Sequence, residues 1–189
     1  MEKMMRSILK NVPSDSRFII PIILFAIFFS GCSHDYSWRK YPIAPERVSL
    51  ATALKPGKSI NIIEENTGSE RRLLGTVGPH KYFGSNQQLA QGILVQISEE
   101  LTLREIKVSG NTRKSLKISV LDAHMTEGIM MRNVDMEVRV AAGNGYERIF
   151  TVSNRSPTSA SADYSYNGAV ALVVIDVLND EKILGYINE

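Results

Sequence analysis

The sequence predicts an α+β domain in which an antiparallel or mixed sheet of about four to five strands is covered on one face by two helices. Two observations lead to this fold class. Hydrophobic residues alternate with a period of two in the middle of the chain, as in half-buried strands, and recur at helical spacing on either side. The 189 residues, 43% of them hydrophobic, suffice for one core of ordinary size.

The predicted domain begins with two short strands. Isoleucines within 60–63 mark the first strand, and the turn-forming residues 66–69 follow it. A second short segment, 71–77, ends at Gly78 and the proline after it.

A helix is predicted over 86–103. Ser85 and Gln88 match a capping box at its start. Apolar residues at four-residue spacing form one stripe along it: Leu89, Ile93, Ile97 and Leu101. We expect this stripe to face the core; the alternative is a groove element that binds a partner.

Three strands are predicted in the middle of the chain. Apolar residues alternate with polar ones over 116–120 and again over 134–140. Gly143 and Gly145 then supply a hairpin turn, and 146–153 forms the returning strand. The two glycines do not indicate a phosphate loop, because neither a helix start nor a Lys-Ser/Thr pair follows them.

The C-terminal part predicts a second, largely buried helix. Small residues over 156–162 form a connection, and 166–178 is strongly apolar. Its β-branched residues favour a strand by propensity alone. However, Asp176, Asn179 and Asp180 would share one narrow polar face of a helix. We therefore predict a helix that continues, after a break, into 183–187.

The N-terminal 31 residues read as a bacterial lipoprotein signal peptide. A basic stretch ends at Arg17, and the twelve uncharged residues 18–29 are too few for a membrane-spanning helix, which needs about 20. Small residues then lead into a cysteine. The sequence Phe29-Ser30-Gly31-Cys32 resembles the lipobox, in which the signal peptidase cuts before the cysteine. Phe29 departs from the usual leucine.

Cys32 is the expected lipidation site. The resemblance implies a diacylglyceryl group on its thiol and an acyl group on its new amino terminus. As the only cysteine of the chain, Cys32 cannot form an intramolecular disulfide. Two alternatives are an inert residue ending an uncleaved anchor and a catalytic thiol; a thiolate nucleophile would need a nearby base. Two or three acyl chains would hold the protein stably on a membrane.

Residue 33 bears on which membrane this is. Asp after the modified cysteine favours retention in the inner membrane, whereas this chain has Ser33. We expect the periplasmic face of the outer membrane. The expected organisation is a signal peptide (1–31), a lipidated N-terminus with a flexible, proline-interrupted tether (32–57), and one periplasmic domain (58–189) that folds without the tether. Trp38 and Tyr41 would lie either at the membrane interface or on the domain.

Charge and composition exclude several functions. Without residues 1–31, the basic total falls from 22 to 18 and the acidic total from 20 to 18, so the mature chain is neutral and lacks the basic field of nucleic-acid-binding proteins. The histidines His34, His80 and His124 have no partner at metal-ligand spacing. The acidic pairs 64–65 and 99–100 flank predicted elements, and no serine-hydrolase elbow or metalloprotease motif occurs. We expect no metal, no cofactor beyond the covalent lipid, and no enzymatic activity.

The layout of the chain resembles the YajG-type bacterial lipoproteins. The resemblance covers most of 58–188 and rests on the lipobox, the tether, the hairpin around Gly143 and three segments of small and apolar residues: 85–89, 116–121 and 164–180. The auxiliary lipoproteins of lipid-exporting ABC systems are a close second. Neither family brings a catalytic residue to this chain.

Three classes of function are open at this point. The first is a non-enzymatic accessory module that binds another envelope protein. The second is an auxiliary subunit that moves lipid or another apolar ligand, which an apolar pocket between helices and sheet would favour. The third is a hydrolase with an unrecognised site, which a cleft gathering His80 or His124 with carboxylates would favour.

Overall fold

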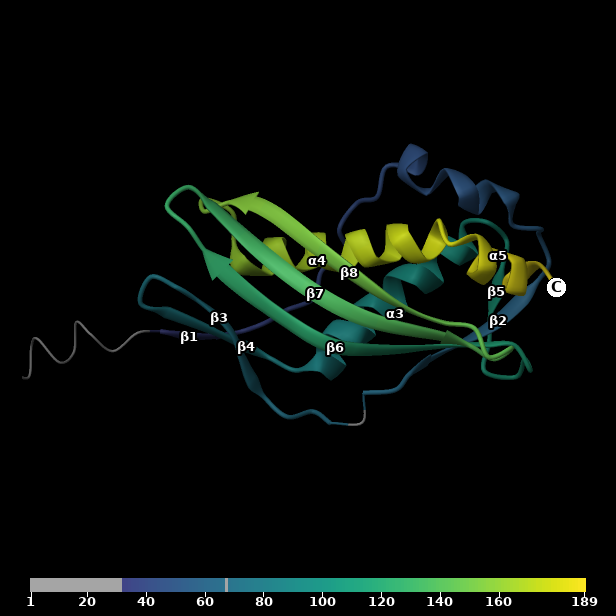
Figure 1. Cartoon of the computed structure of the whole chain (residues 1–189), viewed down its shortest axis with the longest axis horizontal. Helices are drawn as coiled ribbons and strands as arrows, with labels where there is room; N and C mark the ends of the chain where they lie inside the picture. Colours follow the sequence, from purple (N-terminus) through teal and green to yellow (C-terminus); the bar gives the residue numbers. More distant parts are fainter. Residues whose placement is uncertain (1–31, 67) are drawn as a thin grey trace, which may run out of the picture.

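A computed structural model describes residues 32–66 and 68–189, so the expected signal peptide and its recognition residues Phe29, Ser30 and Gly31 lie outside the described residues. The described chain forms one mixed sheet with two long helices on one face (Figure 1). The strands are β1 (Ser33–Asp35), β2 (Ser59–Glu64), β3 (Arg72–Val77), β4 (His80–Gly84), β5 (Lys107–Val108), β6 (Ser115–Glu127), β7 (Met131–Ala142) and β8 (Glu147–Pro157).

The predicted α+β class is confirmed, but the sheet has eight strands rather than four to five. The strands missed are β1, β4 and β5, of which the longest has five residues. Strands this short carry too few side chains to produce an alternating pattern. Backbone pairing with a neighbour defines them instead: β1 lies parallel to β4, and β5 lies parallel to β2.

The two long helices match the predicted ones closely. Helix α3 (Asn86–Thr102) begins at the predicted capping box, and its stripe from Leu89 to Leu101 is fully buried. Helix α4 (Ala162–Leu178) starts four residues earlier than predicted, because Ser161 accepts a hydrogen bond from the backbone N–H of Tyr164. Helix α5 (Glu181–Asn188) follows after the predicted break.

The core lies between these helices and the inner face of the long strands. Every second residue of β7 is buried from Val134 to Val140, as the alternation predicts. Helix α3 contacts β6 and β2, whereas α4 contacts β8 and β7, and the two helices contact each other. The opposite face of the sheet carries mostly polar side chains.

The segment after Cys32 is packed against the domain and does not form the flexible tether that we expected. Strand β1 pairs with β4, and Tyr36 beyond it is buried. A 3-10 segment, η2 (Pro45–Ala53), then lies against α4 and α5 and buries Val48 and Ala51. Prolines break the regular periodicity here, so apolar residues that dock individually leave no recognisable pattern.

Strand β6 is paired along one edge by two different strands. Its first residues pair with β2, and near its end Met125 pairs with Gly75 of β3. Between these pairings β6 has a bulge, at the register shift between Val120 and Asp122. The backbone groups in this gap need partners other than a strand.

Within the part of the chain that the structure describes, no helix combines the length and the apolar character needed to cross a membrane.

Candidate functional site

Cys32, the expected lipidation site, is exposed directly before the first strand. Its carbonyl oxygen accepts a hydrogen bond of 3.0 Å from the backbone N–H of Lys81 in β4. Ser33 already belongs to β1. The cysteine therefore stands at the border of the folded domain, with no linker between them.

A surface groove of about 780 Å³ opens next to β1. The chain beyond β1, the first half of α3 and the connection between β2 and β3 enclose it. Its lining combines aromatic rings with charged and amide groups, among them Asp35, Trp38, Glu64, Arg71, Gln88 and Gln91. Such a lining suits a ligand that offers both apolar and hydrogen-bonding groups.

Trp38 lies directly on the backbone of α3 at Gly92. A Cβ atom added to Gly92 would collide with the indole ring. Glycine destabilises a helix interior relative to alanine. At Gly92 the missing Cβ atom leaves the space that the indole ring occupies. The isolated glycine in the predicted helix marks a position of close packing, although the sequence does not say which residue packs there. Of the two expected positions for Trp38, it occupies the one on the domain.

Two polar atoms of the groove lining are buried without a partner. Trp38 Nε1 can donate a hydrogen bond and Glu64 Oε1 can accept one, yet neither finds a protein partner among the described residues. Leaving such a group unsatisfied costs about 1–3 kcal/mol.

A charged pair borders the groove. Arg71 Nε donates to Asp35 Oδ1 over 2.6 Å, and the Arg71 guanidinium lies 3.8 Å from the centre of the Phe83 ring. Both charged side chains are at least half exposed. The pair is therefore accessible to charged groups of a ligand.

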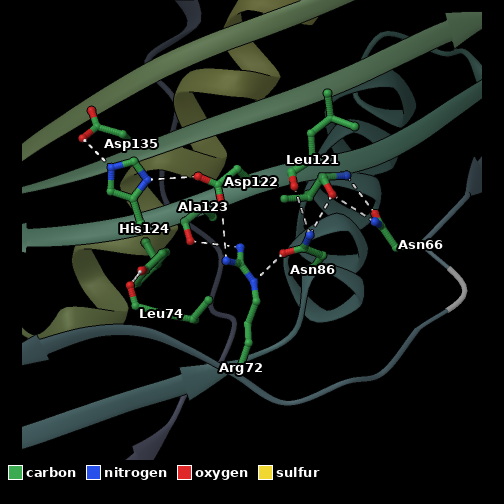
Figure 2. Close-up of polar contacts among 11 residues, drawn as sticks. Asn66, Arg72, Leu74, Asn86, Leu121, Asp122, Ala123, His124 and Asp135 are labelled. Atoms are coloured by element: carbon green, nitrogen blue, oxygen red, sulfur yellow. Dashed lines mark hydrogen bonds and ion pairs between the residues drawn. The ribbon is translucent and has the colours of Figure 1, made fainter.

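A second polar cluster fills the gap beside the bulge of β6 (Figure 2). Asn66 bonds both backbone groups of Val120, its Nδ2 donating over 3.0 Å and its Oδ1 accepting over 2.8 Å. Asn86 Nδ2 also donates to the Val120 carbonyl. Arg72 donates to Asn86, Asp122 and the carbonyl of Ala123. These side chains replace the missing strand, so the cluster is structural.

The histidines occupy two different places. His124 lies on the open face of the sheet, with its Nδ1 3.1 Å from Asp122 and its Nε2 3.6 Å from Asp135 (Figure 2). Partial burial raises the pKa of Asp122, but hydrogen bonds from His124 and the Ala123 N–H and the charge of Arg72 outweigh it and lower that pKa. His34 Nε2 and His80 Nδ1 are 3.2 Å apart at the β1–β4 edge.

Neither histidine place forms a recognisable catalytic or metal site. His124 meets carboxylates, as a hydrolase would require, but on an exposed strand surface rather than in a cleft. Among residues 32–66 and 68–189, no group of three or more His, Cys, Asp or Glu side chains could hold a metal ion.

Comparison with known proteins identifies a shared fold. No family model matches the chain, and no curated protein matches it. Among solved structures, it is similar to protein XCC0632 of the DUF330 family from Xanthomonas campestris, with 11% identity and a TM-score of 0.50 over 81% of this chain and 96% of that one. This likeness shows that the two chains share a fold.

Two further solved structures have lower TM-scores. The hypothetical protein CT253 from Chlamydia trachomatis has 14% identity and a TM-score of 0.44, over 70% of this chain and 98% of its own. A minor lipoprotein from Acinetobacter baumannii has 13% identity and a TM-score of 0.38, over 69% and 92%. The resemblance to YajG-type lipoproteins stays a prediction.

Proposed function

We propose that this protein is a lipid-anchored lipoprotein of the bacterial outer membrane and acts as a non-enzymatic binding or accessory module on the periplasmic side. The observation that carries the proposal is the position of Cys32. It is exposed, it directly precedes β1, and the groove opens a few residues farther along the chain. An acylated Cys32 would therefore hold this groove close to the membrane.

The anchor itself is tested by metabolic labelling with a fatty acid. Cys32→Ser should abolish the label and leave the precursor unprocessed, because serine has no thiol to accept the diacylglyceryl group. Ser33→Ala, at the next residue, is the matched control and should keep the label. Equal labelling of the Cys32→Ser variant and the parent protein would contradict lipidation at this residue.

The groove is the proposed binding surface, and its chemistry suits a peptide segment of another envelope protein. Amide side chains such as Gln88 and Gln91 can pair with a peptide backbone, while Trp38 offers an apolar surface. Asp35 and Arg71 can select charged side chains.

Transport of an apolar ligand has less support from the geometry. An auxiliary lipoprotein of an ABC-type system that carries lipid would need apolar space between helices and sheet. Fully buried side chains from both layers, such as Leu89 and Ile93 of α3 and Ile118 of β6, occupy that region. The groove beside it is bordered by charged and amide groups.

Crosslinking in intact cells tests the binding surface. A photoreactive amino acid at Gln91, which is exposed on the groove side of α3, should capture a partner protein. The same amino acid at Thr151, exposed on β8 of the outer sheet face, should not. Equal capture from both positions would contradict a role for the groove.

The histidines provide the test against catalysis. His80→Gln combined with His124→Gln should leave the cellular phenotype unchanged, because both histidines lie on exposed strands and, among the described residues, neither belongs to a group of side chains that could hold a metal ion. Redirecting the lipoprotein to the inner membrane should weaken the phenotype. Loss of the phenotype in a double variant that folds normally, together with an unchanged phenotype of the redirected protein, would favour a hydrolase.

A further inference from the structure

The turn between β6 and β7 presents two large apolar side chains to solvent. Ile129 is 100% exposed and Met130 is 76% exposed. Glycine, asparagine, aspartate and serine dominate such turns because they adopt the required backbone conformations or bond to it locally. Neighbouring Ile and Met offer neither advantage. Two adjacent exposed apolar side chains at a turn tip are suited to contact an apolar surface outside the protein.

The backbone of this tip is held in place. The Gly128 N–H donates to the Met131 carbonyl over 2.8 Å, and the Thr158 N–H donates to the Met130 carbonyl over 3.0 Å. Just below the tip, the buried Arg132 donates to the Ala160 carbonyl over 2.9 Å. A fixed backbone means that the two apolar side chains project outward persistently.

The tip lies at the same end of the domain as Cys32. Two hydrogen bonds through the β3–β4 hairpin connect them. Glu127 Oε2 at the base of the tip accepts from the Gly78 N–H in the β3–β4 turn, over 3.0 Å. At the other side of that turn, the Lys81 N–H donates to the Cys32 carbonyl. Figure 1 places the start of β1, the β3–β4 turn and the β6–β7 turn together, opposite the C-terminus.

The geometry points to a second membrane contact: the Ile129–Met130 tip inserts into the interface of the bilayer that holds the acyl chains of Cys32. This inference rests on the proposed lipidation. Because Ser33 is already in β1, acylation would bring this end of the domain to the membrane surface. Two apolar side chains leaving water there would add to the anchoring free energy.

The bilayer is the occupant that the position of the tip favours. A protein partner could cover an apolar tip anywhere on the domain, whereas a membrane can cover it only at the anchored end. The anchor and the tip together would also fix the orientation of the domain, because two separate contacts restrict its rotation. The experiment below distinguishes the bilayer from a protein partner that covers the tip.

A single fluorescent probe tests the insertion. Acylation consumes the thiol of Cys32, the only native cysteine, so a cysteine introduced by Met130→Cys can be labelled alone with an NBD fluorophore. Thr151→Cys, exposed on β8 away from the tip, is the matched control. The mature, acylated protein is reconstituted into phosphatidylethanolamine–phosphatidylglycerol vesicles, with or without brominated acyl chains.

The probe at position 130 should shift its emission to the blue and lose intensity in brominated vesicles, while the probe at 151 should give the same spectrum in both. Mass spectrometry and flotation of the same samples report the anchor separately. Acylated, vesicle-bound protein with an aqueous spectrum at 130 overturns the inference alone and indicates a protein partner for the tip. Absence of acyl mass on Cys32 overturns the proposed anchor and, with it, the insertion.

Discussion

Tyr36 donates a hydrogen bond of 2.8 Å from its hydroxyl to the side-chain oxygen of Asn167, across a sequence separation of 131 residues. Both residues are buried, one just beyond β1 and the other in α4. Burial, followed by the charge of Asp163, raises the pKa of Tyr36, so its hydroxyl stays protonated and able to donate. The bond fastens the chain beyond Cys32 to the C-terminal half of the domain.

Tyr36→Phe should lower the free energy of unfolding by about 1–2 kcal/mol, because the buried oxygen of Asn167 loses its short hydrogen bond. Urea denaturation measures the change. Tyr41→Phe is the matched control: its hydroxyl bonds the exposed Tyr164 hydroxyl at 2.9 Å, so its removal should change stability by less than about 0.5 kcal/mol. An equal decrease in the free energy of unfolding for the two variants would show that the buried Tyr36–Asn167 bond is worth no more than the exposed one.

A chain that begins at Lys58 should be less stable than one that begins at Cys32. The deletion removes Tyr36, Val48 and Leu54 from the core and uncovers part of α4. Losing several buried side chains should cost at least about 3 kcal/mol. A thermal melt compares the two chains, and the longer one carries serine in place of Cys32. Equal melting temperatures would indicate that residues 32–57 are a flexible tether.

Gly92→Ala should displace Trp38 from the surface of α3, because a Cβ atom at this position would overlap the indole ring. Trp38 is the only tryptophan of the chain, so a red shift of the intrinsic fluorescence reports its movement into water. Gly185→Ala, in α5, adds the same methyl group where nothing lies within 4 Å and should leave the spectrum unchanged. An unshifted spectrum in Gly92→Ala would contradict the close packing.

Val138→Asp should cost several kcal/mol, because it forces an unpaired charge into the core. Val138 is 0% exposed on β7. Ile149→Asp, on the neighbouring strand but 53% exposed, should stay within about 0.5 kcal/mol of the parent protein. Urea denaturation measures the free energy of unfolding of both variants. Similar decreases would mean that the inward and outward faces of the sheet are wrongly assigned.

The stability of the domain should fall in acid partly through Asp180. Burial raises the pKa of this carboxyl, but hydrogen bonds from the Ile183 N–H, Arg148 and Tyr146 outweigh it and hold the pKa below its usual value. A lowered folded-state pKa contributes stability above the unfolded pKa of about 3.9, and this contribution is lost as the pH falls through the folded value.

Asp180→Ala tests this contribution. At pH 7 it should cost about 1–2 kcal/mol, because Asp180 also caps the start of α5. Between pH 7 and pH 3, the variant should lose less stability than the parent protein. A parallel pH dependence of the two proteins in urea denaturation would show that Asp180 does not titrate with folding.

The long elements could be predicted from the sequence because their patterns repeat several times. The stripe of α3 has four buried positions, and β7 alternates over its whole length. Helix α4 could be predicted despite its β-branched residues, although Asp180, expected on its polar face, is buried where it caps α5. A cap satisfies backbone groups whatever the polarity of its surroundings.

The groove could not be predicted from sequence patterns. It depends on contacts between residues far apart in the chain: Trp38 meets Gly92, and Asp35 meets Arg71. Single contacts of this kind leave no periodicity. The gap beside β6 was missed for a similar reason, because it appears only where β2 and β3 both pair with the same strand.

The pairing of β1 with β4 also limits how far the protein can reach. A free, fully extended segment of residues 33–57 would span about 80 Å, at about 3.3 Å per residue. Folded onto the domain, the segment provides none of this length. If Cys32 is acylated, as we propose, the groove would stay close to the membrane and could not reach a distant target on a long tether. A partner of the groove would then have to come to that membrane surface.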